Sequence, residues 1–151
     1  ILWLAFMSLV VGIIIFGIGE LLVISNQTVI IFEKSDILWR FLLAYGFASL
    51  GMSVVASLAF LFSSLVENSI GPIVSTMAVI IVFLILSAIN IDFFQTIKPY
   101  LFTNYILSWR LFFDDPVDFA ELTKATSVLV GHIVFFFSLA LFLFKRKDIL
   151  T

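Results

Sequence analysis

The sequence predicts an all-α integral membrane protein, a polytopic bundle with four transmembrane helices and short re-entrant or interfacial helices before the last of them. Of its 151 residues, 63% are hydrophobic and 12% are charged, against roughly 45–50% and about 25% in soluble domains. The run Phe41–Val66 contains no Asp, Glu, Lys or Arg. Because about 20 apolar helical residues cross a hydrocarbon core about 30 Å thick, this run is long enough to span a membrane.

Three further runs of similar character complete the predicted bundle, a single transmembrane domain over residues 1–151. The four spans lie at about residues 1–24, 41–66, 69–91 and 125–144. The first contains one charged residue, Glu20. The segment after it, Ser25–Arg40, is expected to form a partly amphipathic turn at the membrane interface. Gly71 and Pro72 suit a tight turn and the first turn of a helix, so the second and third spans should form an antiparallel hairpin.

The segment over residues 92–124 is too aromatic for an ordinary solvated loop. Tyr and Trp prefer the headgroup level of a bilayer. This preference predicts an outer re-entrant element at about residues 92–113, made of two short helices at about 93–97 and 100–112. Its aromatic residues include Phe93, Phe94, Tyr100, Phe102, Tyr105 and Trp109. After the turn that ends the element at Pro116, Asp115 or Asp118 can cap the last helix.

The distribution of basic residues does not settle which side of the membrane each loop faces. Lys145, Arg146 and Lys147 directly follow the last span, and such clusters favour the cytoplasm. Four spans would then place both Ser25–Arg40 and Asp92–Lys124 outside, with more basic residues than the inner side carries. Charge alone therefore leaves the orientation open.

Small hydroxyl side chains recur on one face of the second span. Ser49, Ser53 and Ser57 are spaced four residues apart, which places them on the same side of a helix. Small residues let helix backbones approach closely in lipid. This face is therefore a candidate for helix packing within the bundle, for a subunit interface or for the lining of a polar pathway.

Glu20 and His132 are candidate intramembrane polar sites, since each lies within an apolar run. A carboxylate at the membrane centre costs about 2.5–3.5 kcal/mol, but Glu20 lies near the end of its span. It is either an interfacial anchor or a functional group. His132 is the only histidine and lacks a neighbouring ligand at the spacing of a zinc site. We expect it to hydrogen-bond across helices or to lie in the polar bundle interior, and a proton relay is the sharper alternative.

Several chemistries are not indicated by the sequence. It contains no Gly-x-x-x-x-Gly-Lys-Ser/Thr loop for phosphates, no nucleophile elbow and no His-Glu-x-x-His motif. The absence of cysteine excludes disulfides and cysteine-ligated metals. No basic patch interleaved with aromatic residues suggests a nucleic-acid partner. The sequence therefore predicts no enzyme, cofactor site or metal site on this chain.

Three passages have the character of a known membrane family. They are the helix end and turn at Ala59–Ser69, the aromatic segment Ile97–Tyr105 followed by Trp109, and the aromatic-basic-Asp-Ile ending at Phe142–Ile149. In their order they resemble the C-terminal part of an ABC-2 type transporter permease, the membrane subunit of a bacterial ATP-binding-cassette exporter. The resemblance extends over essentially the whole chain.

The resemblance implies a permease subunit that forms the translocation path for export of an unidentified substrate, as a multi-pass protein of the bacterial plasma (inner) membrane. The four spans would be the third to sixth of six, with the Lys145 end cytoplasmic and the coupling helix before Ile1. The partners would be a second permease subunit, in a homo- or heterodimer, a separate ATPase subunit that holds ATP and magnesium, and the lipid bilayer. The aromatic residues of the outer element would form an outer gate.

Two other functions fit the same residues. A non-transporting scaffold or anchor subunit of a larger complex would use the Ser49, Ser53 and Ser57 face to recruit a partner. An intramembrane enzyme would depend on Glu20 or His132. Association with an ATPase would distinguish the permease from both.

Overall fold

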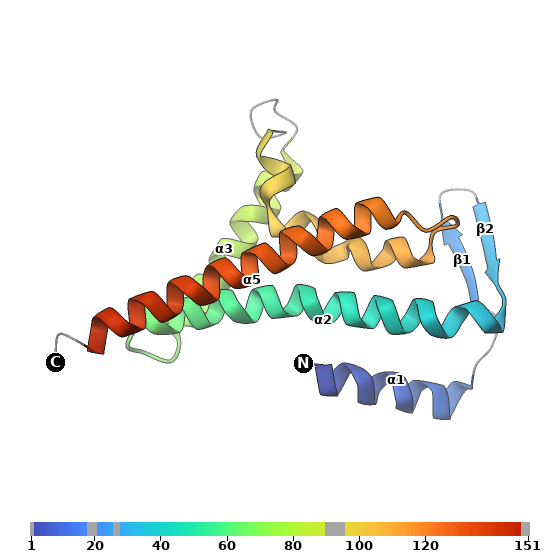
Figure 1. Ribbon diagram of the computed structural model, residues 1–151, viewed down its shortest axis with the longest axis horizontal. Helices are drawn as coiled ribbons and strands as arrows, with labels where there is room; N and C mark the ends of the chain where they lie inside the picture. Colours follow the sequence, from blue (N-terminus) through green and yellow to red (C-terminus); the bar gives the residue numbers. More distant parts are fainter. Residues whose placement is uncertain (1, 18–20, 26–27, 90–95, 149–151) are drawn as a thin grey trace.

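The computed structural model of the chain describes residues 2–17, 21–25, 28–89 and 96–148 (Figure 1). In this part of the chain, α-helices are joined by one β-hairpin and by 3₁₀ segments. The α-helices are α1 (Leu2–Phe16), α2 (Lys34–Leu65), α3 (Gly71–Ala88) and α5 (Phe119–Asp148). The strands are β1 (Leu21–Ser25) and β2 (Thr28–Phe32), and the 3₁₀ segments are η1 (Lys98–Tyr100), η2 (Phe102–Asn104) and η3 (Ile106–Phe113).

Three of the described helices, α2, α3 and α5, are long and apolar enough to cross a membrane. They correspond to the spans predicted at 41–66, 69–91 and 125–144. At 1.5 Å per residue, the 32 residues of α2 and the 30 residues of α5 extend about 45–48 Å. This length exceeds the hydrocarbon thickness of about 30 Å, so both helices can tilt or continue into the headgroup layer.

The prediction of a continuous first span over residues 1–24 is wrong. Helix α1 has 15 residues, which makes it about 22 Å long and shorter than the hydrocarbon core. It ends at Gly17, whose φ of 71° lies in the left-handed region that glycine adopts readily. The backbone N–H of Gly17 donates to the carbonyl of Ile13 at 2.8 Å. From Leu21 the chain is a β-strand, and Glu20 lies outside the described residues.

The two strands form an antiparallel hairpin in which Leu21 is opposite Phe32 and Ser25 is opposite Thr28. β-branched residues at positions 28–31 favour this extended conformation. The hairpin replaces the amphipathic turn expected over Ser25–Arg40, and the second half of that segment is already the first turns of α2.

Helix α2 lies at the centre of the bundle and runs in the same direction as α5 (Figure 1). Its buried positions recur at alternating intervals of three and four residues, which is the spacing of a coiled-coil seam. The buried Leu122, Ala125 and Leu129 of α5 repeat this spacing. The seam of α2 consists of Ile37, Arg40, Ala44, Phe47, Gly51, Val54, Leu58 and Leu61.

Helix α3 follows α2 through a tight turn and runs back at a steep angle to it, so the predicted reversal of direction is present although the two helices diverge (Figure 1). The turn between them is held by Asn68, whose side-chain oxygen accepts a hydrogen bond from the backbone N–H of Gly71 at 2.6 Å. A Cβ at Gly71 would collide with the side chain of Val66. Pro72 occupies the first turn of α3, as predicted, because its missing N–H is not needed there.

The aromatic segment before the last helix differs from the two short α-helices that were predicted. Over Tyr100–Phe112 the chain forms the 3₁₀ segments η2 and η3, and most of the other predicted helix, at 93–97, lies outside the described residues. The eight-residue η3 packs between α2 and α5 (Figure 1). A 3₁₀ run of more than three or four residues is uncommon because its hydrogen-bond geometry is poor. Tertiary packing therefore maintains η3.

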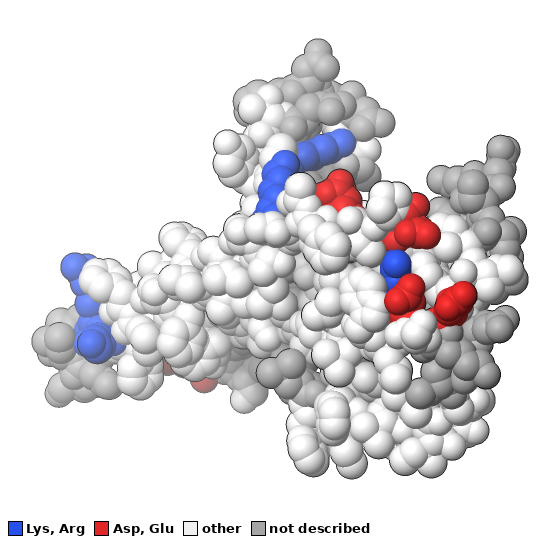
Figure 2. Space-filling view, turned by 45° about the vertical axis from the view of Figure 1, so that its right-hand side comes forward, with Lys and Arg blue, Asp and Glu red and all other residues white. Residues whose placement is uncertain are grey.

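Most acidic side chains gather at one end of the bundle, whereas basic side chains occur at the other end, among the acidic ones and between the two (Figure 2). Figure 2 shows basic side chains at the end where α5 finishes and acidic side chains gathered at the opposite end, where α5 begins. Lys145 and Arg146 are exposed at the first end. The exposed acidic residues near the hairpin, η3 and the start of α5 are Glu33, Asp36, Asp114, Asp115, Asp118 and Glu121.

Asp118, one of the two residues predicted to cap the last helix, caps α5. Its Oδ1 atom accepts hydrogen bonds from the backbone N–H groups of Ala120 and Glu121, both at 3.0 Å. Replacing Asp118 with alanine is expected to destabilise this turn by about 1 kcal/mol, which corresponds to roughly fivefold faster exchange of those two amides. Hydrogen–deuterium exchange would measure it. Asp118→Asn retains an acceptor and should exchange like the unaltered protein, whereas equal exchange in all three proteins would contradict the cap.

Candidate functional site

Arg40 is a buried cation at the junction of β2, α2 and η3, with 6% of its surface exposed. Its Nη1 atom donates to the carbonyl oxygens of Phe112 at 2.8 Å and Asp114 at 2.9 Å. Its guanidinium carbon lies 4.3 Å from the ring centroid of Phe32 and 4.9 Å from that of Trp39. Carbonyls at a helix C-terminus lack helical partners and carry partial negative charge. Arg40 therefore ties the end of η3 to α2 and the hairpin.

This junction leaves part of the guanidinium unsatisfied. Within the described part of the chain, Nε of Arg40 is buried without a hydrogen-bond partner. A buried charge is costly unless its remaining donors are satisfied, so the cost of burial is offset only in part. The two carbonyls and the two aromatic rings are therefore the contacts that compensate the burial of this charge.

Farther along α2, Gly51 contacts the start of η3. A Cβ added at Gly51 would lie 3.7 Å from the Cα atom of Ile106, an ordinary van der Waals separation. Two aromatic pairs extend this contact toward Arg40. Phe47 and Phe112 have ring centroids 6.2 Å apart, and Phe41 and Phe113 have centroids 5.1 Å apart. η3 therefore follows α2 from Gly51 to Arg40.

His132 belongs to an aromatic cluster around Phe102 of η2. Phe102 is fully buried, and its ring centroid lies 5.5 Å from His132, 5.6 Å from Phe83 and 6.2 Å from Phe136. The Nδ1 atom of His132 lies 2.8 Å from the carbonyl oxygen of Val128 on its own helix. The hydrogen bond across helices that the sequence suggested is therefore replaced by one within α5. A proton-relay role stays a prediction.

The four described residues predicted for an outer gate differ in burial, although Phe102, Tyr105 and Trp109 share one hydrophobic core. Tyr100 is exposed, Phe102 and Tyr105 are buried, and Trp109 is half-buried. The hydroxyl of Tyr105 donates to the carbonyl of Pro99 at 3.0 Å, which fixes η1 against η2. The remaining two, Phe93 and Phe94, lie outside the described residues.

The serine face of α2 is turned inward, with Ser49 and Ser57 buried and Ser53 half-buried. The hydroxyl of Ser53 donates to the carbonyl of Ser49 at 2.8 Å, and that of Ser57 to the carbonyl of Val54 at 2.7 Å. Hydroxyls bonded to their own helix need no partner from another one. Packing and pathway lining both remain predictions for this face.

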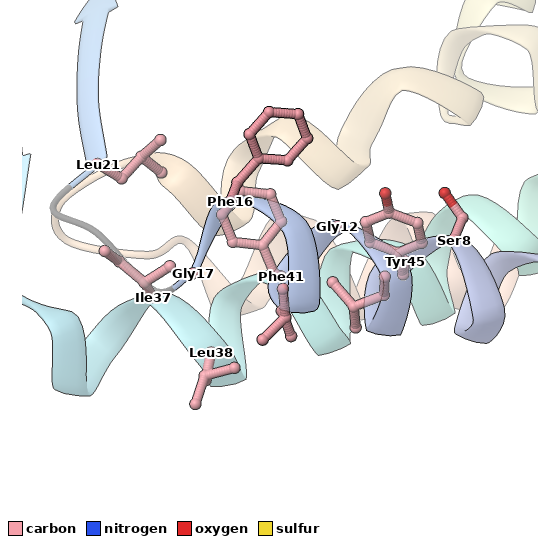
Figure 3. A pocket seen from close by; sticks show the side chains of 11 residues that line it. Ser8, Gly12, Phe16, Gly17, Leu21, Ile37, Leu38, Phe41 and Tyr45 are labelled. Atoms are coloured by element: carbon pink, nitrogen blue, oxygen red, sulfur yellow. The ribbon is translucent and has the colours of Figure 1, made fainter.

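An apolar groove runs along the side of α2 that faces α1 and η3. One section, of about 310 Å³, lies between α1 and α2, and Figure 3 shows Ser8, Gly12 and Phe16 of α1 beside Phe41 and Tyr45 of α2. Adjoining sections of about 280 and 470 Å³ lie between α2, η3 and β1. Phe41 lines all three sections, which therefore adjoin one another beside α2.

The sequence analysis did not predict that Arg40 is buried or that Arg110 lines the groove. Arg40 was expected in an interfacial turn, although its position three residues after Ile37 and four before Ala44 places it on the seam of α2. A charged residue at a seam position was the available signal. Arg110 is exposed, lies 5.6 Å above the Trp109 ring and lines the groove, and no sequence pattern marks it.

Comparison of the chain with protein-family models, curated proteins and solved structures gives no match.

Proposed function

We propose that this chain is a permease subunit of an ATP-binding-cassette exporter in a bacterial plasma membrane. It would form the translocation path together with a second permease subunit, while a separate ATPase subunit binds and hydrolyses ATP. The proposal rests first on the three helices that are long and apolar enough to cross a membrane. The sequence has no phosphate-binding loop, and the proposal assigns ATP hydrolysis to a separate chain.

The packing of η3 between α2 and α5 is the observation that carries the proposal. η3 is a 3₁₀ segment, which is intrinsically weak, and it is held by Arg40 at one end and contacts α2 at Gly51 near the other. A short weak element between two long helices suits a gate, because it can detach without unfolding either helix. The acidic end of the bundle, where η3 finishes, would be the outer side.

In the proposed mechanism, the gate is closed while Arg40 holds the carbonyls of Phe112 and Asp114. Opening would separate η3 from α2 and break these contacts together. ATP binding to the partner subunit can drive this change only if the partner binds ATP more tightly in one of the two states. The chain's own residues therefore supply the two states, and the ATPase selects between them.

Purification of the protein from its native membranes tests this proposal. We expect an ATPase subunit to co-purify with it, and the complex to hydrolyse ATP in reconstituted vesicles. Replacing the phosphate-loop lysine of that partner should abolish hydrolysis without releasing it from the complex. A purified protein that carries no ATP-hydrolysing chain would contradict the permease function and favour a scaffold.

A further inference from the structure

The groove beside α2 has the dimensions of a lipid chain in one leaflet. Along α2 its lining extends from Ile37 to Ala48, eleven helical steps or about 16 Å. Half of a hydrocarbon core is about 15 Å. The lining of its inner part is apolar or small, with Phe41, Tyr45 and Gly12 among its members.

Two opposite charges lie at the hairpin end of the groove. Arg110 and Asp114 line its widest section together with Leu21 and Trp109. Both charged side chains are exposed. Within the described residues, neither side chain has a hydrogen bond or ion pair to the other or to a third residue. The end of the groove therefore offers one free cation and one free carboxylate to an incoming group.

The surroundings of these two charges are acidic. Asp115 and Asp118 follow Asp114 closely in the chain and are exposed, so a net negative headgroup would meet repulsion here. A headgroup that carries both a phosphate and an ammonium matches the pair, with the phosphate on Arg110 and the ammonium on Asp114. Arginine suits phosphate because its planar guanidinium presents several donors.

We propose that this groove binds one zwitterionic phospholipid that bears an amine headgroup, as phosphatidylethanolamine does. Its acyl chain lies along α2 between α1 and η3, and its headgroup is held between Arg110 and Asp114. Because this site needs only a bilayer, the proposal goes beyond the permease function and does not depend on it.

Quenching of Trp109 fluorescence by brominated lipid chains tests the site, since Trp109 lines the groove. The protein would carry Trp3→Phe and Trp39→Phe so that Trp109 alone reports. In vesicles of brominated phosphatidylcholine, unlabelled phosphatidylethanolamine should relieve quenching about two- to fivefold more effectively than unlabelled phosphatidylglycerol, the range of a surface ion pair. A preference for the anionic lipid, or no preference, would overturn the proposal.

Two variants separate the acyl and headgroup contacts. Gly12→Leu fills the groove, and a Cβ at Gly12 meets no atom within 4 Å, so the helix should fold normally. It should reduce quenching of Trp109 and abolish the headgroup preference, whereas the matched Gly131→Leu on α5, where a Cβ is equally free, should leave both unchanged. Arg110→Gln should abolish the preference and keep the quenching. If Gly12→Leu and Arg110→Gln both retained the preference, the groove would not be the site.

Discussion

Replacing Arg40 with methionine is expected to free the C-terminal end of η3 from α2 and β2. The substitution keeps an unbranched side chain but removes the donor to the carbonyls of Phe112 and Asp114. Hydrogen bonds from charged donors contribute about 1.5–3 kcal/mol each, and part of this is offset because the guanidinium is no longer buried. A net loss of about 2–3 kcal/mol corresponds to roughly 30- to 150-fold faster amide exchange over Leu111–Asp114.

Arg110→Met is the matched control. Arg110 belongs to η3 itself and is exposed, and among the described aromatic rings it contacts only that of Trp109. An exposed cation–π contact contributes about 0.5–1 kcal/mol, so exchange should rise only a few fold. Arg40→Lys can direct one nitrogen toward both carbonyls and should recover part of the stability. Equal exchange in Arg40→Met and Arg110→Met would show that Arg40 does not hold η3.

A disulfide between positions 51 and 106 is expected to stop the proposed transport cycle. The chain has no cysteine, so the double variant Gly51→Cys, Ile106→Cys contains the only pair. A Cβ at position 51 lies 3.7 Å from both the Cα and the Cγ2 atoms of Ile106, so the Cβ of residue 106, which is bonded to both, is near the separation of about 3.5–4.5 Å that a disulfide requires between Cβ atoms. If η3 must leave α2, oxidation should lower ATP hydrolysis by the reconstituted complex at least about tenfold, a barrier change of about 1.4 kcal/mol.

Reduction with dithiothreitol should restore the activity of the same sample, which separates the crosslink from damage to the fold. Gly51→Cys alone and Ile106→Cys alone, treated with the same oxidant, show the effect of each side chain without a bridge. A fully crosslinked complex that hydrolyses ATP at its uncrosslinked rate would mean that η3 stays on α2 throughout the cycle, and the gate would have to lie elsewhere.

Charge-free runs predict α2, α3 and α5 well because lipid imposes a minimum length on any crossing helix. They do not predict where these helices end. α5 begins at Phe119, six residues before the predicted span, and continues to Asp148, since a helix need not stop where the hydrocarbon does. The prediction that Ser25–Arg40 and Asp92–Lys124 share one side agrees with the bonds from Arg40 to Phe112 and Asp114.

Features that depend on distant contacts were not predictable in the same way. The length of α1 is limited by Gly17, a small residue within an otherwise apolar run, and apolar content alone does not distinguish a helix from a strand after it. Arg40 and Phe112 are 72 positions apart, so nothing local marks Arg40 as buried. η3 is 3₁₀ rather than α-helical, and the contacts that maintain it come from α2 and α5.

Exposed charged side chains at both ends of the bundle limit how it can move in a bilayer. Turning it over in a bilayer would require the exposed carboxylates near η3 and the cations Lys145 and Arg146 to exchange sides through hydrocarbon. Each charged side chain costs several kcal/mol at the membrane centre. The topology adopted at insertion is therefore kinetically trapped. A transmembrane voltage acts on these charges while the orientation of the bundle in the bilayer stays fixed.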